Sequence, residues 1–539
     1  MTDDPGPESQ MPPTPLEPGS PALSRRAVLG GTVGGLALVG LGGVLGHSLN
    51  HPTSSSLDVN ELAEEQHFIT RPDLRPPTVR FTSLQGNAAT ASAAPRFIFV
   101  SPRSVIETLH QLGVVLVPSQ IRKPPSQPGL MILDQLGRMV YFKPVPTQNP
   151  FDFNMQLEGS TPRLTWWQGQ ITVGHGVGVG HLADERYATV NTVHAGHGLM
   201  TDCHELTLTS AGTALITAYQ DTTADLSRVG GARQARVWAG HIQEIDLATG
   251  KVLFDWNSLE HVGVDESYTA VPGKKTAYDY FHINSIKELA DGNLLVSARN
   301  TWACYKIDRS SGAVIWRMNG KRSDFTMDPG TNFYWQHDAR MPDPATLTLF
   351  DDGAFPAEEK RSRGLVLSVD TTAMHVSLRQ AFVHPAGFIA ATQGSMELLA
   401  DGNVLVGWGN QGYFTQFAPD GSIVFDGQFP PRVCSYRAFS HEWVGSPTES
   451  PAVVVRRNSS GGSYIYVSWN GATEVAVWKV LAGATPHALH TVGSQEWTGF
   501  ETSISVNASG PYFVVVGLDK HGRELGRSEV TKMNGQTYA

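Results

Sequence analysis

The stretch that decides the fold is Tyr280-Phe281-His282-Ile283-Asn284-Ser285-Ile286, followed by Leu294-Leu295-Val296-Ser297-Ala298-Arg299-Asn300. Both runs are short, apolar and rich in strand-forming residues, and the turn Asp291-Gly292 lies between them. This pattern predicts a β-hairpin. Similar hairpins are predicted at 208–216 and 399–406. A hairpin that recurs along the chain indicates a fold built from equivalent β units.

A second kind of hairpin alternates with the first. In it an Asp precedes a Gly by up to four residues, and a β-branched or aromatic run follows the Gly, as at 133–141, 245–254, 307–316 and 418–425. The Gly supplies the positive φ that such a turn requires. One hairpin of each kind makes a four-stranded antiparallel unit, and repeated units of this kind are typical of a β-propeller.

Five such units can be placed along the chain, near 154–197, 202–256, 282–316, 337–383 and 393–429. The strands before Lys143 and the segment 435–443 are left over, and together they are expected to close a sixth blade. We therefore predict an all-β protein with a six-bladed β-propeller over residues 68–445. The alternating strands after that point predict a β-sandwich of the fibronectin or immunoglobulin kind over residues 446–539.

The first 67 residues differ from the rest. Residues 1–23 are polar and rich in proline, which predicts disorder. Arg25-Arg26 then precedes an uncharged, glycine-rich apolar run that continues to Gly46. Paired arginines before such a run indicate a twin-arginine export signal. We expect residues 1–47 to be this signal or a membrane anchor, residues 48–67 to be a linker, and the protein to be extracellular or part of the cell envelope.

Charge and cysteine content exclude some classes of function. The net charge is −10, and Lys and Arg are not clustered, which argues against nucleic acid as a partner. The three cysteines, Cys203, Cys304 and Cys434, fit no zinc-binding spacing. We expect them to be buried small side chains, with one disulfide after export as the alternative.

Histidine recurs at one place in the repeat. His204, His282 and His337 each stand near the start of a unit, and Gln393 takes the same place in the next one. If the units are blades, these side chains converge on one end of the central channel. Arg299 ends the second strand of the His282 unit, and Asn284 follows His282 by two residues, so that we expect the two to share a strand face.

These residue types suit a tetrahedral oxyanion. A guanidinium offers a planar fork of donors for sulfate or phosphate oxygens, and a neutral imidazole can act as a nucleophile or as a general base. Two other interpretations remain open. In one, the histidines brace each blade by hydrogen bonding; in the other, they hold zinc together with Glu205 and Asp338. The tryptophans at 166, 167, 302, 316 and 335 are expected to lie mostly in the core.

Four stretches together resemble the bacterial arylsulfotransferase family, and more closely its actinobacterial and fungal branch. They are Asp202-Cys203-His204-Glu205-Leu206, Asp279-Tyr280-Phe281-His282-Ile283-Asn284, Ser297-Ala298-Arg299-Asn300-Thr301-Trp302 and Trp335-Gln336-His337-Asp338-Ala339-Arg340. The resemblance covers about residues 68–445. It implies a six-bladed propeller that moves a sulfuryl group from an aryl sulfate to a phenol, without a nucleotide donor or other cofactor.

The resemblance also implies roles for individual residues. His337 would be the nucleophile of a ping-pong reaction that passes through a sulfohistidine. His282, Asn284 and Arg299 would hold the sulfuryl oxygens, and His204 would assist the phenolic oxygen or the sulfate. Gln393 is predicted to bind substrate, because it takes the repeat position of the histidines. We expect no metal in this mechanism.

The sequence thus leaves three functional hypotheses. The first is an exported arylsulfotransferase that acts on a small aryl sulfate donor and a phenolic acceptor. The second is a non-catalytic propeller that binds an anionic or phenolic ligand, and the third is a metal-dependent hydrolase. Well-studied members of the family carry their β-sandwich before the propeller. Here it follows, so dimerisation through it does not carry over.

Overall fold

The computed structural model describes residues 64–83, 96–105, 125–172, 174–508, 510–533 and 536–538. The predicted export signal or anchor lies outside these residues, as does all of the predicted linker before residue 64. Among the described residues, no helix is long and apolar enough to cross a membrane.

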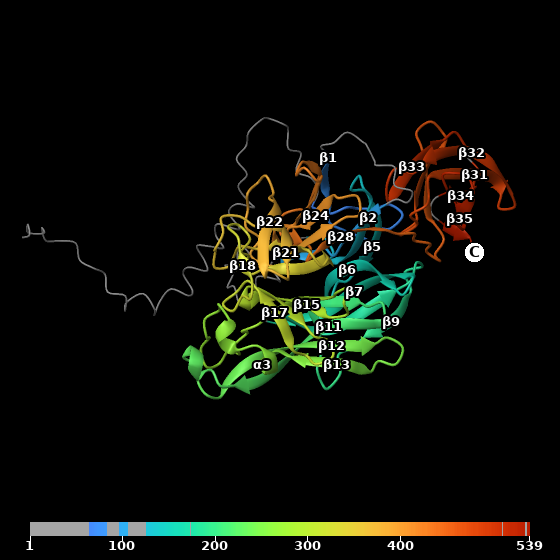
Figure 1. The fold of residues 1–539 in the computed structure, drawn as a ribbon. Coiled ribbons are helices and arrows are strands. Elements are labelled where there is room, and N and C mark those ends of the chain that lie inside the picture. The colour runs from blue at the N-terminus through green and yellow to red at the C-terminus, as the bar shows by residue number, and fades with distance from the viewer. Residues whose placement is uncertain are drawn as a thin grey trace, which may run out of the picture. The chain divides into compact units, whose positions relative to one another are not determined.

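Six four-stranded antiparallel units form most of the fold, as predicted (Figure 1). We number them as blades 1 to 6 in chain order. Blade 1 contains β28 (Ala438–Glu442), β2 (Arg96–Val100), β4 (Gly129–Leu133) and β5 (Met139–Pro144). Blade 2 contains β6 (Asn149–Glu158), β7 (Thr161–Thr172), β8 (His175–Ala183) and β9 (Thr189–Val193). Blade 3 contains β10 (Thr201–Leu208), β11 (Thr213–Ala224), β12 (Ala235–Asp246) and β13 (Val252–Asn257), and a single residue pair links it to blade 2.

The other three blades follow the same plan. Blade 4 contains β14 (Ile283–Glu288), β15 (Leu294–Ala298), β16 (Ala303–Ile307) and β17 (Val314–Met318). Blade 5 contains β19 (His337–Asp343), β20 (Thr346–Asp351), β21 (Arg363–Asp370) and β22 (His375–Phe382), with β18 (Thr326–Met327) added at its edge. Blade 6 contains β23 (Ser395–Leu398), β24 (Val404–Gly407), β25 (Tyr413–Phe417) and β26 (Ile423–Gln428).

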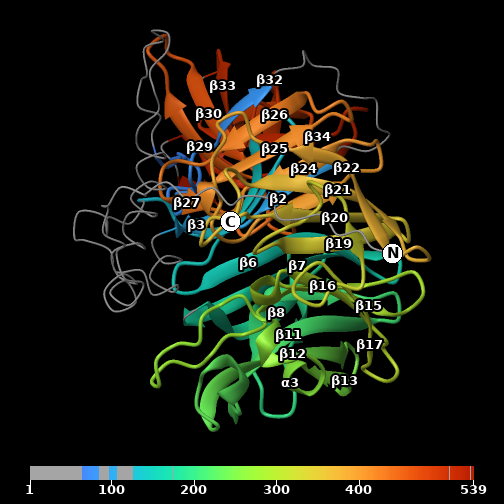
Figure 2. The same ribbon diagram turned by 60° about the vertical axis from the view of Figure 1, so that its left-hand side comes forward.

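The ring closes where the sequence predicted. The first strand of each blade contacts the first strand of the next, in the order β6, β10, β14, β19, β23 and β28, and β28 returns to β6. In blade 1 the C-terminal β28 pairs with the N-terminal β2 (Figure 1), which Figure 2 labels from another side. A further early strand, β1 (Arg80–Ser83), pairs with β26 of blade 6. Two joins between distant parts of the sequence therefore seal the sheet edges.

Small elements lie between the blades. β3 (Arg103–Ser104) pairs with β27 (Val433–Cys434). The described short helices are η2 (Ser227–Val229), α3 (Ser258–His261), η3 (Val264–Glu266), η4 (Arg299–Thr301) and η5 (Gly409–Gln411). All three cysteines are buried and not bridged by a disulfide, which confirms the expectation that they are small core side chains.

Hairpin chemistry explains why the blade strands turn where they do. Asp308 Oδ1 accepts hydrogen bonds from the backbone N–H groups of Ser310 and Ser311, at 3.0 and 2.8 Å. Gly312, with φ of 74°, then turns the chain into β17. Asp246 and Gly250 repeat this arrangement between β12 and β13. The side chain of Asp thus replaces backbone partners within the turn, and Gly adopts the left-handed conformation without a steric cost.

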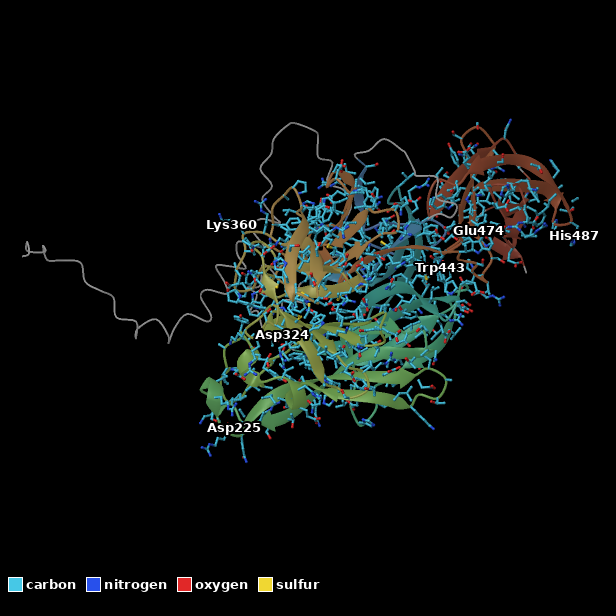
Figure 3. The ribbon with its side chains drawn as sticks, in the orientation of Figure 1. Asp225, Asp324, Lys360, Trp443, Glu474 and His487 are labelled. Atoms are coloured by element: carbon cyan, nitrogen blue, oxygen red, sulfur yellow. The ribbon has the colours of Figure 1, made fainter. Side chains whose placement is uncertain are left out.

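Apolar side chains fill the spaces between neighbouring blades. One cluster joins blades 3 and 4 through Leu215, Tyr280 and Val296. Another joins blades 1 and 2 and includes Trp443, which Figure 3 labels, with Trp166. The tryptophans at 166, 167, 302, 316 and 335 are all buried, which confirms that they belong mostly to the core.

Residues after the propeller form a sandwich of two antiparallel sheets. One sheet contains β29 (Ala452–Arg457), β30 (Ser463–Ser468) and β33 (Glu501–Val506). The other contains β31 (Val477–Thr485), β32 (Ala488–Glu496), β34 (Tyr512–Leu518), β35 (Glu524–Arg527), β36 (Val530–Lys532) and β37 (Gln536–Tyr538). Val467, Trp478 and Phe513 contribute to one apolar cluster between the sheets. Kinship with fibronectin domains in particular stays a prediction.

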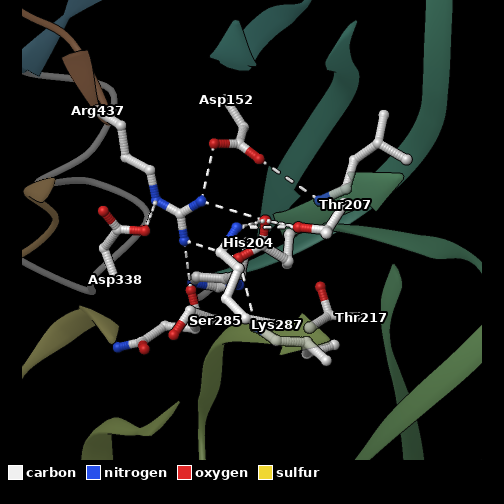
Figure 4. Close-up of polar contacts among 12 residues, drawn as sticks. Asp152, His204, Thr207, Thr217, Ser285, Lys287, Asp338 and Arg437 are labelled. Atoms are coloured by element: carbon white, nitrogen blue, oxygen red, sulfur yellow. Dashed lines mark hydrogen bonds and ion pairs between the residues drawn. The ribbon is translucent and has the colours of Figure 1, made fainter. Parts of the chain in front are cut away.

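A buried arginine links the inner strands of the propeller (Figure 4). Arg437, just before β28, donates hydrogen bonds to Asp152 on β6 at 2.9 Å and to Glu205 on β10 at 3.2 and 3.3 Å. It also donates to the backbone oxygen of Asn284 on β14 at 2.7 Å, and its Nε lies 3.7 Å from Asp338 on β19. One guanidinium thus contacts the first strands of four other blades.

Burial raises the pKa of the Glu205 carboxyl, but Arg437 and Lys287 outweigh burial and hold that pKa down at about 2. Lys287 donates to the same carboxylate at 3.0 Å. Each buried charge of this cluster is therefore stabilised by its oppositely charged neighbours, because burial removes most of the water that would otherwise solvate it.

We predict that Arg437→Met lowers the free energy of unfolding by about 3–5 kcal/mol, because it leaves buried carboxylates without their partner. Urea unfolding followed by tryptophan fluorescence measures this change. Arg322→Met is the control: Arg322 also pairs with a carboxylate, that of Asp265 at 2.6 Å, but its side chain is 51% exposed. A change below about 1 kcal/mol is expected there. Equal effects of the two substitutions would contradict the prediction.

Candidate active site at the inner strands

The three predicted histidines lie on the innermost strands. His204 belongs to β10 of blade 3, His282 directly precedes β14 of blade 4, and His337 begins β19 of blade 5. Gln393 precedes β23 of blade 6. The imidazole rings of His204 and His282 are close, with 4.8 Å between centroids. The structure therefore brings His204 and His282 together, and it places His337 beside Gln393, whose backbone N–H donates to the His337 ring.

One detail of the predicted geometry is wrong. His282 and Asn284 were expected to share the face of one strand. His282 instead lies outside β14 in the left-handed conformation, with φ of 57°, and the strand register shifts between Ile283 and Ser285. Strand alternation does not apply across such an irregularity. The His282 ring bonds to Asp279, whereas Asn284 Nδ2 donates to the backbone oxygen of Gln336 at 2.6 Å.

Each of the three imidazoles is held by a carboxylate at Nδ1. The Nδ1–O distances are 2.6 Å from His204 to Asp202, 2.5 Å from His282 to Asp279 and 2.6 Å from His337 to Asp352. Because a carboxylate accepts, Nδ1 carries the proton, and Nε2 keeps its lone pair in the neutral ring. The backbone N–H of Gln393 donates to Nε2 of His337 at 3.3 Å, which requires the same tautomer.

Burial keeps the rings of His282 and His337 neutral. Desolvation lowers the pKa of His282 to about 4, although Asp279 opposes the shift. Desolvation also lowers the pKa of His337 well below its ordinary value, and the positive charge of Arg299 adds to the effect. At neutral pH, His282 and His337 are therefore uncharged, as a nitrogen nucleophile must be.

Arg299 supplies a positive charge to the candidate active site. Its backbone N–H donates to the carbonyl oxygen of His282 at 2.9 Å, so the two residues are adjacent. Its guanidinium lies 4.8 Å from the ring centre of Trp335 and donates to the backbone oxygen of Ala391 and to Asn300 Oδ1, both at 3.2 Å. Within the described residues no carboxylate forms an ion pair with it. Its charge is thus available to an anion.

Gln393 is tied to a second buried arginine. Arg103 Nη2 donates to Gln393 Oε1 at 3.0 Å, and the Arg103 guanidinium lies 3.9 Å from the ring centre of Phe151. Gln393 thus connects this guanidinium with His337. Its predicted contact with substrate stays a prediction.

Two residues weighed as zinc ligands lie elsewhere. Glu205 and Asp338 are occupied by Arg437. The described donor atoms also group differently from the expected trio, because His282 clusters with His175 and Asp279 rather than with His204 and His337. The structure therefore does not assemble the three-histidine zinc site that the sequence left open.

Sequence reasoning missed the orienting carboxylates and His175. Asp202 and Asp279 stand two and three residues before their histidines, so this short spacing was a usable signal. Asp352 follows β20, fifteen residues after His337. Only the hairpin of blade 5 brings the two together. His175 lies between two glycines at the start of β8, and no motif marks it.

The fold and site define a class: a six-bladed propeller whose inner strands present carboxylate-held imidazoles beside a buried guanidinium. The profile of the arylsulfotransferase (ASST) family matches residues 155–430, just over half of the chain. The chain belongs to this family. No curated protein matches it.

Solved structures give distant likenesses. A protein of unknown function from Bacteroides caccae is 10% identical, covers 64% of this chain and 99% of its own, and has a TM-score of 0.37. A protein from Lactobacillus plantarum is 13% identical over 76% of this chain and 98% of its own, with a TM-score of 0.33. Virginiamycin B lyase from Staphylococcus aureus is 11% identical over 71% and 95%, with a TM-score of 0.27. Likenesses this distant say nothing about the reaction.

The site predicts an unusual titration for His282. Because the native pKa is about 4, the ring should stay neutral, with its proton on Nδ1, as the pH falls through 6.5. Nitrogen-15 NMR of histidine-labelled protein, with single-histidine variants for assignment, reports both the tautomer and the titration midpoint. A midpoint near 6.5 in folded protein would contradict the burial argument.

Proposed function

We propose that this protein is an exported arylsulfotransferase that moves a sulfuryl group from an aryl sulfate to a phenol by a ping-pong reaction through a sulfohistidine on His337. The observation that carries the proposal is the set of three imidazoles, each held by a carboxylate at Nδ1, beside Arg299. Membership of the arylsulfotransferase family supports the reaction class.

In the first half-reaction, the Nε2 lone pair of His337 forms a bond to sulfur. The bond from sulfur to the aryl oxygen breaks, and its electron pair leaves with the phenolate. The ring keeps its Nδ1 proton and becomes a positively charged sulfohistidine, and the Asp352 carboxylate stabilises that charge. Arg299 is proposed to hold the non-bridging sulfuryl oxygens, which carry the negative charge throughout, and His282 would donate to them only when its Nε2 takes up a proton.

In the second half-reaction, the acceptor phenol gives its proton to Nε2 of His204 and attacks sulfur. The nitrogen–sulfur bond breaks, and its electron pair returns to Nε2 of His337. The proton on His204 leaves to the first phenolate or to solvent, so the net reaction exchanges one phenol for another. Asp202 would stabilise the His204 imidazolium at 2.6 Å.

Asn284 takes a different part in this proposal from that of the other residues. It is buried, and its amide holds the backbone of Gln336, next to His337. Asn284 would therefore act through the position of the nucleophile and of the anion-binding groups.

We predict that His337→Ala lowers transfer from 4-nitrophenyl sulfate to a phenol by at least about 10³-fold, because no other group replaces the nucleophile. His375→Ala is the matched control. His375 lies on β22 of the same blade, is partly exposed and pairs with Asp328 at 2.9 Å, so full transfer is expected.

Mass spectrometry of protein quenched during turnover should find sulfate on His337. Binding of donor analogues without turnover would instead favour the non-catalytic propeller. Release of sulfate without any acceptor product would indicate a hydrolase. Full transfer by a folded His337→Ala protein would overturn the nucleophile assignment.

Export is proposed from Arg25-Arg26 and the apolar run that follows. Replacing both arginines with lysine should retain the folded protein inside the cell, because a twin-arginine signal is read through its arginine pair. Fractionation of cells that produce the native and altered chains measures this outcome. Unchanged export of the altered chain would contradict the proposal.

A further inference from the structure

His175 is a buried histidine that the proposed reaction does not use. It is 4% exposed, and neither of its ring nitrogens has a hydrogen-bond partner among the described residues. Its ring packs against Tyr219 and Trp238, at 4.1 and 4.9 Å between centroids. A buried imidazole without a hydrogen bond is destabilising, so its position needs a physical reason.

The neighbours of His175 suggest that reason. Its Nε2 lies 3.4 Å from Asp279 Oδ2, and its ring centroid is 5.4 Å from that of His282. Donor atoms of His175, Asp279 and His282 all lie within 4.8 Å of one another. The second carboxylate oxygen, Asp279 Oδ1, is also buried without a hydrogen-bond partner. His175 and Asp279 thus each have a possible metal-ligand atom without a hydrogen-bond partner, and both residues belong to this one cluster.

We propose that His175, Asp279 and His282 form a binding site for a divalent transition-metal ion, with Zn²⁺ as the best fit. Two histidines and one carboxylate are a ligand set that zinc accepts, and they leave a fourth position open. This proposal does not rest on the proposed function, because it requires nothing of His337.

The spacing suits such an ion after one local change. Two ligands of one tetrahedral zinc ion, each about 2.0–2.1 Å from it, lie about 3.3 Å apart, close to the 3.4 Å between His175 Nε2 and Asp279 Oδ2. His282 Nδ1 now shares a proton with Asp279 Oδ2 at 2.5 Å. The ion would bind the Nδ1 lone pair while the proton of the ring moves to Nε2, and the two ligand atoms would separate to the spacing of ligands.

The surroundings support a metal ion as well. Tyr219 and Trp238 form an apolar wall beside His175, and Asn300 Nδ2 donates to the backbone oxygen of Asp279 at 2.6 Å. Such a wall and such a fixed backbone hold ligands in place. The Asp279 side chain is 24% exposed, which gives an ion a path from solvent.

The site would also affect how a sulfate ester binds. His282 belongs both to this ligand set and to the predicted sulfuryl-binding group, next to Arg299. A divalent cation here would add positive charge beside the anion and reinforce the single guanidinium.

The test is zinc binding by the full-length protein after treatment with chelator, measured by competition with a chromophoric zinc indicator and by metal analysis of the dialysed protein. Wild type should bind one ion per chain. His175→Ala should weaken binding by at least about 100-fold, because even partners of ligands contribute 10–100-fold. Asp279→Asn, which keeps the size of the side chain, should do the same. Circular dichroism and thermal melting show whether each variant is folded.

His384→Ala is the matched control, because His384 is a buried histidine 3.3 Å from the Asp426 carboxylate and belongs to no such cluster. Its zinc affinity should be unchanged. Co²⁺ in place of zinc should give the visible absorption of a four-coordinate ion in wild type, and His175→Ala should lose it. Absence of saturable binding in wild type, or equal binding by folded His175→Ala, would overturn the proposal. His337→Ala should still bind zinc, so this outcome and the transfer assay are independent.

Discussion

The fold depends on the contacts that Arg437 makes at the centre of the ring. Its guanidinium reaches Asp152, Glu205 and Asp338, which lie on three different inner strands, and the backbone of Asn284 on a fourth. Buried carboxylates of this kind repel one another and resist desolvation unless a cation satisfies them. Arg437 directly precedes β28, the strand that closes blade 1, so one segment of the chain both closes the ring and neutralises its centre.

The candidate active site is built on the inner strands that Arg437 contacts. Asn284 accepts from Arg437 through its backbone oxygen and holds Gln336 through its side chain, next to His337. The inner strands that the arginine aligns are the strands that carry His204, His282 and His337. Carboxylates then fix each ring at Nδ1, and burial keeps His282 and His337 neutral. The same desolvation that makes the central ion cluster costly thus gives these imidazoles a usable lone pair.

The repeated hairpin pattern in the sequence made much of the fold and of the histidine positions predictable. Hairpins turn at Gly292, Gly402, Gly250 and Gly312, as their turn residues predicted. These turns were predictable because turn chemistry depends only on neighbouring residues. The equivalent repeat positions of the three histidines also indicated their convergence. The strand-face argument for His282 and Asn284 failed, because a left-handed residue and a register shift interrupt the alternation on which it relied.

The sequence by itself determined the all-β class, the six blades, the closure by distant strands and the histidine set, since each follows from short-range periodicity and from counting repeats. Only the tertiary structure decided that Asp352 holds His337, that Arg437 satisfies Glu205 and Asp338, and that His175 meets Asp279 and His282. The reason is physical. These contacts join residues of different strands or blades, and their geometry depends on how neighbouring blades pack, which no local pattern encodes.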